Sequence, residues 1–251
     1  MKNWIVCIVA LIVSPTLWAA DESATLQWSQ RVELSLPVSG VVQNVNVNAG
    51  QIVKKGQVLL SLDNTIYQSK VTENQAVIKR LVAEFEEAKR DFDRVQELHE
   101  RTVVATAELD QAKLRLTRTE TLLTEAKASL RQQQKTLDDS VLRAPYDAMV
   151  LSRQAEVGMS VAAGLQPQIL MVLAKSGEML ARLYMPATQI EKLQSGQSVT
   201  VLVGKESFAG KIKALGWEPL KIKDENVYQV DVLFASVTPL RAGTPALVKL
   251  P

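Results

Sequence analysis

Residues 39–63 read SGVVQNVNVNAGQIVKKGQVLLSLD, and residues 144–174 repeat their pattern as APYDAMVLSRQAEVGMSVAAGLQPQILMVLA. Alternating valines and punctuating glycines are typical of short strands joined by tight turns. The copies align at a separation of 108 residues: Val42 with Val150, Gly50 with Gly158, Val53 with Val161 and Gly56 with Gly164. A two-residue insertion near Gln166 and Pro167 then aligns Leu60 with Leu170 and Leu62 with Val172. The repeat predicts one small β-domain whose two halves, residues 38–63 and 141–174, meet in space.

Residues 64–140, between the copies, change to the periodicity of helices. The first helix has seam positions spaced alternately three and four residues apart: Val71, Asn74, Ile78, Leu81, Phe85, Ala88, Phe92 and Val95. In the second helix the seam consists of Leu109, Leu116, Leu123, Leu130 and Leu137, with Ala112, Thr119, Ala126 and Gln133 between them. Such heptads predict a coiled coil, and residues 64–144 contain no proline or glycine to interrupt it.

The heptad phase breaks between Thr102 and Leu109, where the chain must turn. At this turn either Thr106 caps the second helix or Ala105 ends the loop ahead of it. The result is an antiparallel α-helical hairpin that projects roughly 50 Å at about 1.5 Å per residue. His99, the only histidine, lies near this turn beside Glu100 and Arg101, and we expect it to be solvated.

Residues 175–251 contain short apolar segments with turn signals and predict a small β-barrel. A short helix is expected just after Pro186, in ATQIEKL. Strands are expected at residues 178–185, 199–203, 208–215, 227–234 and 246–250. Residues 21–37 form an N-terminal strand segment. The predicted fold class is therefore an elongated, mixed α and β protein.

Residues 1–20 have the pattern of a secretory signal peptide. Lys2 precedes an apolar run from residue 5 to 13, and small residues follow, so cleavage is expected after Ala19 or Ala20. An uncleaved membrane anchor is the alternative. Cys7, the only cysteine, lies in this segment, so the mature chain would have no disulfide and no cysteine metal site.

No pattern in the chain predicts catalysis. A single histidine excludes a triad or a multi-histidine metal site within one chain, and no phosphate-binding or dinucleotide-binding fingerprint occurs. The adjacent carboxylates of Asp138 and Asp139 lie where the second helix ends, where we expect them to be solvated. A net charge of +2 does not favour nucleic acid as a partner. We therefore assign no catalytic, cofactor-binding or metal-binding residue and expect a protein that is not an enzyme.

The two copies resemble the halves of a lipoyl/biotinyl-type β-sandwich. In a carrier protein of that fold, a modified lysine lies on the turn that joins the halves. Here helices replace that turn, while Lys54 and Lys55 lie on a different one. The carrier interpretation is therefore poor, and the fold it leaves is a lipoyl-like sandwich with an inserted hairpin.

The whole order of segments resembles the periplasmic adaptors, or membrane fusion proteins of the HlyD-like family, of tripartite efflux pumps. The resemblance rests on VSGVVQNVNVNAGQIVKKGQVLLSLD, LRAPYDAMV and LARLYMPATQIEKLQSGQSVTV. It implies transmembrane transport with an inner-membrane transporter, RND rather than ABC, and a TolC-like outer-membrane duct. It also implies a ring of several copies in the periplasm, held at the inner membrane through the transporter. The length resembles that of the shorter adaptors. An envelope tether unrelated to transport is the alternative function.

In adaptors that meet a TolC-like duct, the hairpin tip carries arginine, leucine four residues later and serine seven further on. Arg94 and Leu98 match this pattern, whereas Ala105 takes the place of the serine, with Thr106 beside it. The alternative is an exposed helix arginine and a leucine at the seam edge. Ala148 is a second departure, because the family usually has glycine there. Either the backbone tolerates a Cβ atom or the turn differs.

Overall fold

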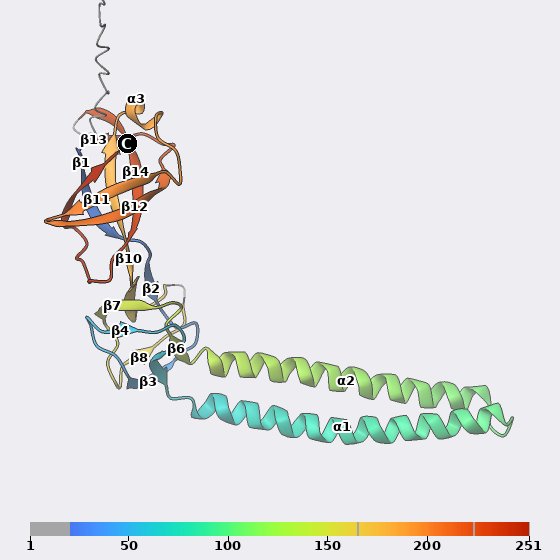
Figure 1. The fold of residues 1–251 in the computed structure, drawn as a ribbon. Helices are drawn as coiled ribbons and strands as arrows, with labels where there is room; N and C mark the ends of the chain where they lie inside the picture. Colours follow the sequence, from blue (N-terminus) through green and yellow to red (C-terminus); the bar gives the residue numbers. More distant parts are fainter. Residues whose placement is uncertain (1–20, 165, 223, 251) are drawn as a thin grey trace, which may run out of the picture. The chain divides into compact units, whose positions relative to one another are not determined.

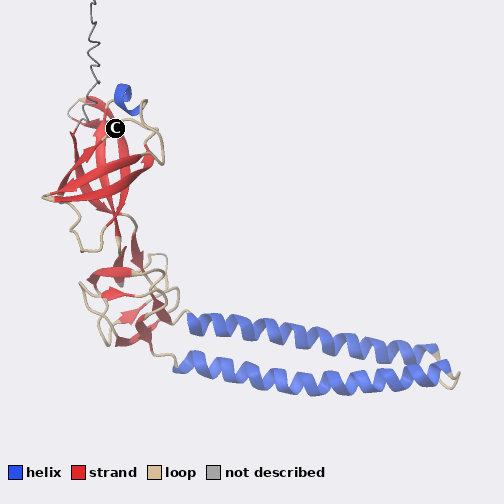
Figure 2. Cartoon of the chain, viewed as in Figure 1, coloured by secondary structure: helices blue, strands red, loops and turns tan. Residues whose placement is uncertain are grey.

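A computed structural model describes residues 21–164, 166–222 and 224–250 of the chain (Figure 1). The chain divides into two compact units. Of the described residues, one unit consists of those within 31–174, and the other combines residues 21–30 with those within 175–250. Figure 2 shows the first unit as small sheets with a long helical hairpin and the second as a β-barrel. These are the components that the sequence predicts.

The sandwich of the first unit consists of two four-stranded sheets. Each sheet takes strands from both copies of the repeat, and apolar side chains fill the space between the sheets. One sheet has the order β2 (Arg31–Leu34), β9 (Met171–Lys175), β7 (Ala148–Arg153) and β4 (Ile52–Val53). The other has the order β6 (Val141–Arg143), β5 (Val58–Leu62), β3 (Gly40–Val45) and β8 (Ser160–Val161).

Equivalent glycines join the two halves of the sandwich. The amide of Gly50 donates to the carbonyl of Val150 at 2.7 Å, and the amide of Gly158 donates to the carbonyl of Val42 at 2.8 Å. Both glycines have positive φ, 85° and 86°, which residues with a Cβ atom rarely adopt. The separation of 108 residues is therefore confirmed as a structural repeat in this part of the motif.

The expected two-residue insertion is wrong by one residue. The amide of Asn46 donates to Leu59 at 2.8 Å, while its equivalent, Gln154, donates to Leu170 at 2.9 Å. Leu170 therefore corresponds to Leu59 and not to Leu60. The same shift makes the core residues agree, since Leu60 then matches Met171 and Leu62 matches Leu173. The second half contains three extra residues ahead of its last strand.

Ala148 occupies an ordinary strand position. It is fully buried in β7 and pairs with Val53 of β4. Of the two alternatives that the sequence leaves open, the backbone therefore tolerates a Cβ atom. The equivalent position in the first copy is Gly40, where a Cβ atom would lie 3.1 Å from the Leu62 side chain. The two halves thus differ in how closely the neighbouring strand approaches.

The inserted hairpin consists of α1 (Thr65–Glu100) and α2 (Thr106–Asp138), which lie side by side and antiparallel (Figure 1). Every seam position that the sequence predicts is buried or half-buried, and the fully buried ones are Val71, Leu81, Ala88, Val95, Ala112, Leu123 and Ala126. The coiled-coil prediction is confirmed. Within the described residues, no helix combines the length and the apolar character that a membrane crossing requires.

Contacts with the sandwich hold the hairpin at its base, where α1 begins and α2 ends. The amide of Leu62 donates to the carbonyl of Ser140 at 2.9 Å, directly below the two helices. The hydroxyl of Tyr67, in the first turn of α1, donates to the carbonyl of Ser39 at 2.5 Å. The helices therefore begin and end at a rigid base.

The second unit is a closed barrel of six antiparallel strands. Their order is β10 (Glu178–Met185), β1 (Asp21–Trp28), β15 (Pro245–Lys249), β11 (Ser198–Val203), β12 (Glu206–Leu215) and β14 (Glu225–Ala235), which pairs again with β10. The short helix α3 (Ala187–Ile190) follows β10, and the unexpected strand β13 (Leu220–Ile222) pairs with β14. The N-terminal segment is shared, because β1 belongs to the barrel whereas β2 belongs to the sandwich.

We expect Leu123→Ala to destabilise the hairpin by about 2–5 kcal/mol, because Leu123 packs in the seam with Leu81 and truncation would leave a cavity. Urea unfolding followed by circular dichroism at the helical band measures the change. The neighbouring Leu122 is exposed, so Leu122→Ala is the matched control and should have little effect. Equal losses for both variants would contradict the assigned seam.

Candidate functional site

The hairpin tip is a Schellman turn at the end of α1. The amide of Thr102 donates to the carbonyl of His99 at 2.8 Å, and the amide of Val103 donates to that of Leu98 at 2.9 Å. This pair of bonds defines the motif, in which the residue after the cap takes left-handed backbone angles. Glycine usually fills that position, but here Thr102 does, with φ of 60°. A β-branched residue in this conformation is strained.

His99 belongs to the hairpin seam, so the expectation that it is solvated is wrong. It lies four residues after Val95, which is the next heptad position, and it is half-buried. Its Nδ1 atom lies 3.1 Å from the carbonyl oxygen of Val104. A carbonyl can only accept, so Nδ1 carries the proton and donates. The imidazole thereby holds the loop against the end of α1.

Three of the four residues expected at the tip lie at the turn itself. Leu98 is half-buried and supplies the carbonyl that closes the Schellman turn. Ala105 is exposed and is the N-cap of α2, with an extended backbone. No side chain caps this end of α2, so of the two alternatives Ala105 ends the loop and Thr106 does not act as a cap. Thr106 is exposed as the first residue of the helix.

Arg94 lies one helical turn before Leu98, on the same side of α1. Its guanidinium is exposed and forms an ion pair with Asp91. Asp91 also accepts a hydrogen bond from Arg115 of α2 at 2.9 Å. The carboxylate therefore links both helices and holds Arg94 along the hairpin surface.

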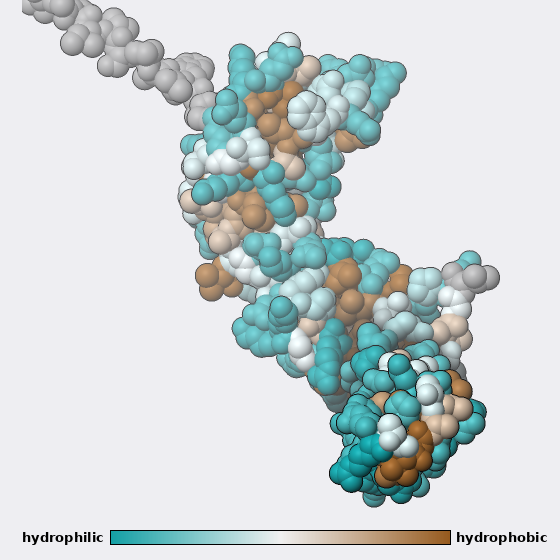
Figure 3. Space-filling model, turned by 90° about the vertical axis from the view of Figure 1, so that its right-hand side faces the viewer, coloured by the Kyte–Doolittle hydropathy of each residue, from teal (hydrophilic) through white to brown (hydrophobic). Residues whose placement is uncertain are grey.

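Val103 is an exposed apolar residue that the sequence does not single out as functional. Its exposed fraction is 67%, and it lies at the extreme end of the hairpin. Figure 3 looks onto this end, at the lower right, where hydrophobic surface is surrounded by hydrophilic surface. The sequence feature that could have pointed to Val103 is the run of three β-branched residues, Thr102, Val103 and Val104, at the break in the heptad pattern. The tip can therefore offer a small apolar contact surrounded by polar groups.

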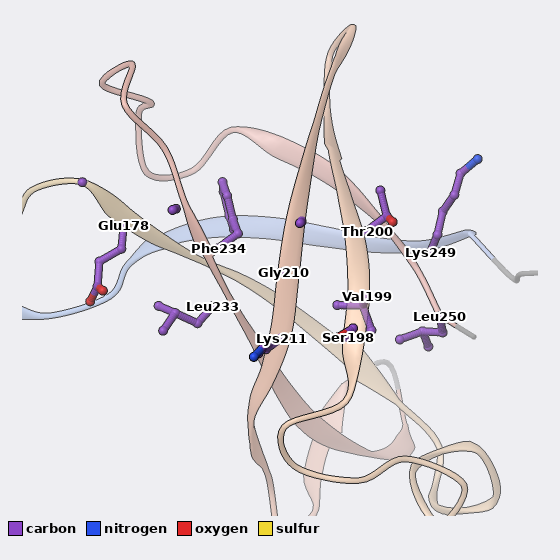
Figure 4. A pocket seen from close by; sticks show the side chains of 13 residues that line it. Glu178, Ser198, Val199, Thr200, Gly210, Lys211, Leu233, Phe234, Lys249 and Leu250 are labelled. Carbon is purple, nitrogen blue, oxygen red and sulfur yellow. The ribbon is translucent and has the colours of Figure 1, made fainter.

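The barrel has a large open hollow of about 760 Å³ (Figure 4). Leu233 and Phe234 line it together with Val199, whereas Figure 4 shows the charged ends of Glu178 and Lys249 diverging from one another. A ligand site needs polar groups that converge on one point. Among the described residues, no group of three or more acidic, histidine or cysteine side chains is placed to hold a metal ion. We assign no catalytic role to this hollow.

A split sandwich with an inserted coiled-coil hairpin, together with a β-barrel, is the fold of solved membrane fusion proteins. Residues 30–172 match the family model described as CzcB-like, barrel-sandwich hybrid domain. The chain belongs to this family.

The chain is 27% identical over 217 residues to the macrolide export protein MacA of Yersinia pestis, an alignment that covers 79% of this chain and 58% of that relative. It thus spans little more than half the length of MacA.

Solved structures support the same fold. The membrane fusion protein Spr0693 from Streptococcus pneumoniae R6 matches with a TM-score of 0.70 and 15% identity, over 92% of this chain and 97% of that one. A MacA-MexA chimera containing the Pseudomonas aeruginosa MexA α-hairpin domain matches with a TM-score of 0.64 and 20% identity, over 91% and 79%. The expected preference for an RND over an ABC transporter gains no support from these relatives.

We expect Thr102→Gly to stabilise the hairpin by about 1 kcal/mol, because glycine adopts the left-handed conformation without a clash between its Cβ atom and the backbone. Urea unfolding of the hairpin, or hydrogen exchange at the Val103 amide, measures the gain. Thr106→Gly makes the same exchange in a helical backbone and should give no gain. Equal effects of the two substitutions would rule out strain at Thr102.

Proposed function

We propose that this protein is a non-catalytic adaptor that bridges an inner-membrane transporter and a TolC-like outer-membrane duct during efflux. The hairpin is the observation that supports this function. Its helices of 36 and 33 residues reach roughly 50 Å at about 1.5 Å per residue. A two-helix rod that is fixed at its base and apolar at its end is suited to reaching a distant partner.

In this proposal the duct binds the four tip residues Arg94, Leu98, Ala105 and Thr106, joined by Val103. The apolar side chains supply buried contact area, and Arg94 supplies charge by exchanging Asp91 for an acceptor on the duct. Ala105 stands where the family pattern has a serine and has no hydroxyl. In this proposal the hydroxyl of the adjacent Thr106 makes the hydrogen bond to the duct instead. Thr106 is free to do so, since its side chain does not cap α2.

The remaining parts of the proposal follow the family. Residues 38–63 and 141–174 form the lipoyl-like domain, residues 64–140 the hairpin and residues 175–251 the barrel, while residues 21–37 lead into them.

Several copies form a ring. Exposed Val41, Val157 and Ile66 near the hairpin base supply apolar surface for contacts between copies. The signal peptide, residues 1–20, lies outside the described residues and would direct the chain to the periplasm. Either an RND or an ABC transporter in the inner membrane fits this proposal.

The proposed tip contact predicts crosslinking of Ala105→Cys to the outer-membrane duct. Cys7 lies in the predicted signal, so the new thiol would be the only one in the mature chain. A cysteine-reactive photocrosslinker in intact cells, followed by mass spectrometry, identifies the captured protein. Glu125→Cys, on an exposed part of α2 away from the tip, is the control and should not capture the duct. Capture of an unrelated envelope protein would instead favour the tether function.

Val103→Asp should abolish efflux, because the carboxylate would be desolvated when the apolar tip binds its partner. The assay is complementation of a deletion strain, scored by its susceptibility to a panel of exported compounds. Leu114→Asp is the matched control, since Leu114 is 71% exposed on α2 and the same charge is introduced away from the tip. Full complementation by Val103→Asp, with both variants expressed and folded, would contradict the tip contact.

A further inference from the structure

Two arginines share one carboxylate close to the hairpin tip. The Oδ1 atom of Asp91 pairs with the guanidinium of Arg94 on the same helix. The Oδ2 atom of Asp91 accepts a hydrogen bond from Arg115 of α2 at 2.9 Å. The Asp91 side chain is 22% exposed, whereas those of Arg94 and Arg115 are 71% and 60% exposed. The carboxylate is thus mostly enclosed, while both cations reach solvent.

This arrangement allows Arg94 to leave without stranding a charge. If Arg94 turns away, Asp91 still accepts from Arg115 through its second oxygen. A partly buried carboxylate that loses its last partner is strongly destabilised, whereas one that keeps a partner avoids most of that cost. The ion pair that breaks is an exposed one, and such pairs are weak. The exchange of Arg94 between partners is therefore inexpensive.

The guanidinium that leaves Asp91 selects a carboxylate as its new partner. Arg94 gives up a charge-assisted hydrogen bond on leaving, and such bonds are stronger than those between neutral groups. A neutral amide or hydroxyl would not replace what is lost. Among the side chains of a partner protein, only an aspartate or a glutamate restores a bond of the same kind.

The surrounding charges leave Arg94 open to an anion that approaches from the tip. Glu87 lines the same groove of about 670 Å³, but it lies seven residues nearer the base, which is about 10 Å at about 1.5 Å per residue. Glu97, three residues beyond Arg94, already pairs with Arg101. Asp93 precedes Arg94 and lies about 100° away around the helix.

We propose that Asp91 and Arg115 are positioning residues that control when Arg94 binds a carboxylate of the outer-membrane duct. Asp91 competes with the duct for Arg94, and Arg115 keeps Asp91 paired when Arg94 moves to the duct. The inference rests on the proposed bridging function and adds the chemistry of the partner, an acidic side chain that the duct presents to the tip. Neither residue belongs to the arginine, leucine and serine pattern of the tip.

Two substitutions that break the same bond between the helices should change duct binding in opposite directions. Asp91→Asn frees Arg94 and should raise the crosslinking yield from Ala105→Cys about two- to fivefold, the effect of one exposed ion pair. Arg115→Gln leaves Asp91 to Arg94 alone and should lower that yield. A merely structural role predicts a loss in both cases, because each variant removes the one ion pair that joins the described residues of α1 and α2. Yields are compared in intact cells at limiting irradiation and at equal levels of adaptor and duct.

The gain must also depend on Arg94. In an Arg94→Gln chain, Asp91→Asn should no longer raise the yield, as a double-mutant cycle measures. A gain that persists without Arg94 would overturn the inference, as would a yield of Asp91→Asn at or below that of the parent chain. If Ala105→Cys captures no duct in any variant, the bridging function fails and this inference with it. Equal capture by all variants would overturn the inference alone.

The acidic partner is tested with Arg94→Lys in the Asp91→Asn chain. A water-soluble carbodiimide joins an amine to a carboxylate in contact with it. Mass spectrometry of the product captured from Ala105→Cys should then show an amide bond between the amine at position 94 and an aspartate or glutamate of the duct. Arg94→Gln in the same chain has no amine and is the matched control, which should lack this bond. Capture of the duct without a carboxylate joined at position 94 would contradict the proposed chemistry of the partner.

Discussion

The reciprocal hydrogen bonds of Gly50 and Gly158 are the constraint on which the sandwich and the hairpin depend. Each glycine turns the chain in one copy and donates to a strand of the other copy, so neither half can form its sheet alone. Once the halves are joined, the amide of Leu62 donates a hydrogen bond to the carbonyl of Ser140. The insertion then needs no long flexible loop, because helices that leave and return at adjacent points can pack along their whole length.

Polar pairs between the helices give the hairpin seam its register. Leucines and alanines alone would allow the helices to slide by a heptad. The hydroxyl of Ser129 donates to the side-chain oxygen of Asn74 at 2.9 Å, and Asp91 accepts from Arg115 further toward the tip. A shift by seven residues would separate the partly buried Ser129 hydroxyl from the Asn74 side-chain oxygen, which costs more than a lost apolar contact, and would also separate Asp91 from Arg115. The position of the tip relative to the base is therefore fixed at two levels along the rod.

Sequence patterns predict the parts of this fold that depend on local periodicity. The heptads identify the seam, and the repeat identifies both halves of the sandwich. What they miss depends on pairing between distant segments. The alternation in residues 21–37 cannot show that β1 completes a barrel with β15, which is more than two hundred residues away. The true length of the insertion becomes visible only through the partners of Asn46 and Gln154. His99 is different, because continuing the heptad from Val95 would have predicted its burial.

Strain at Thr102 is the point where local preference and structure disagree at the tip. Glycine would adopt the same turn at a lower energy, and the other tight turns at Gly50, Gly158 and Gly196 use it. Departures from such local rules tend to occur at functional sites, where another requirement outweighs stability. A glycine there would leave the chain on either side of it freer, whereas threonine restricts the backbone and keeps Val103 presented in one orientation. The strained residue thus lowers the entropy that the tip would lose on binding, which is the advantage of a preorganised contact.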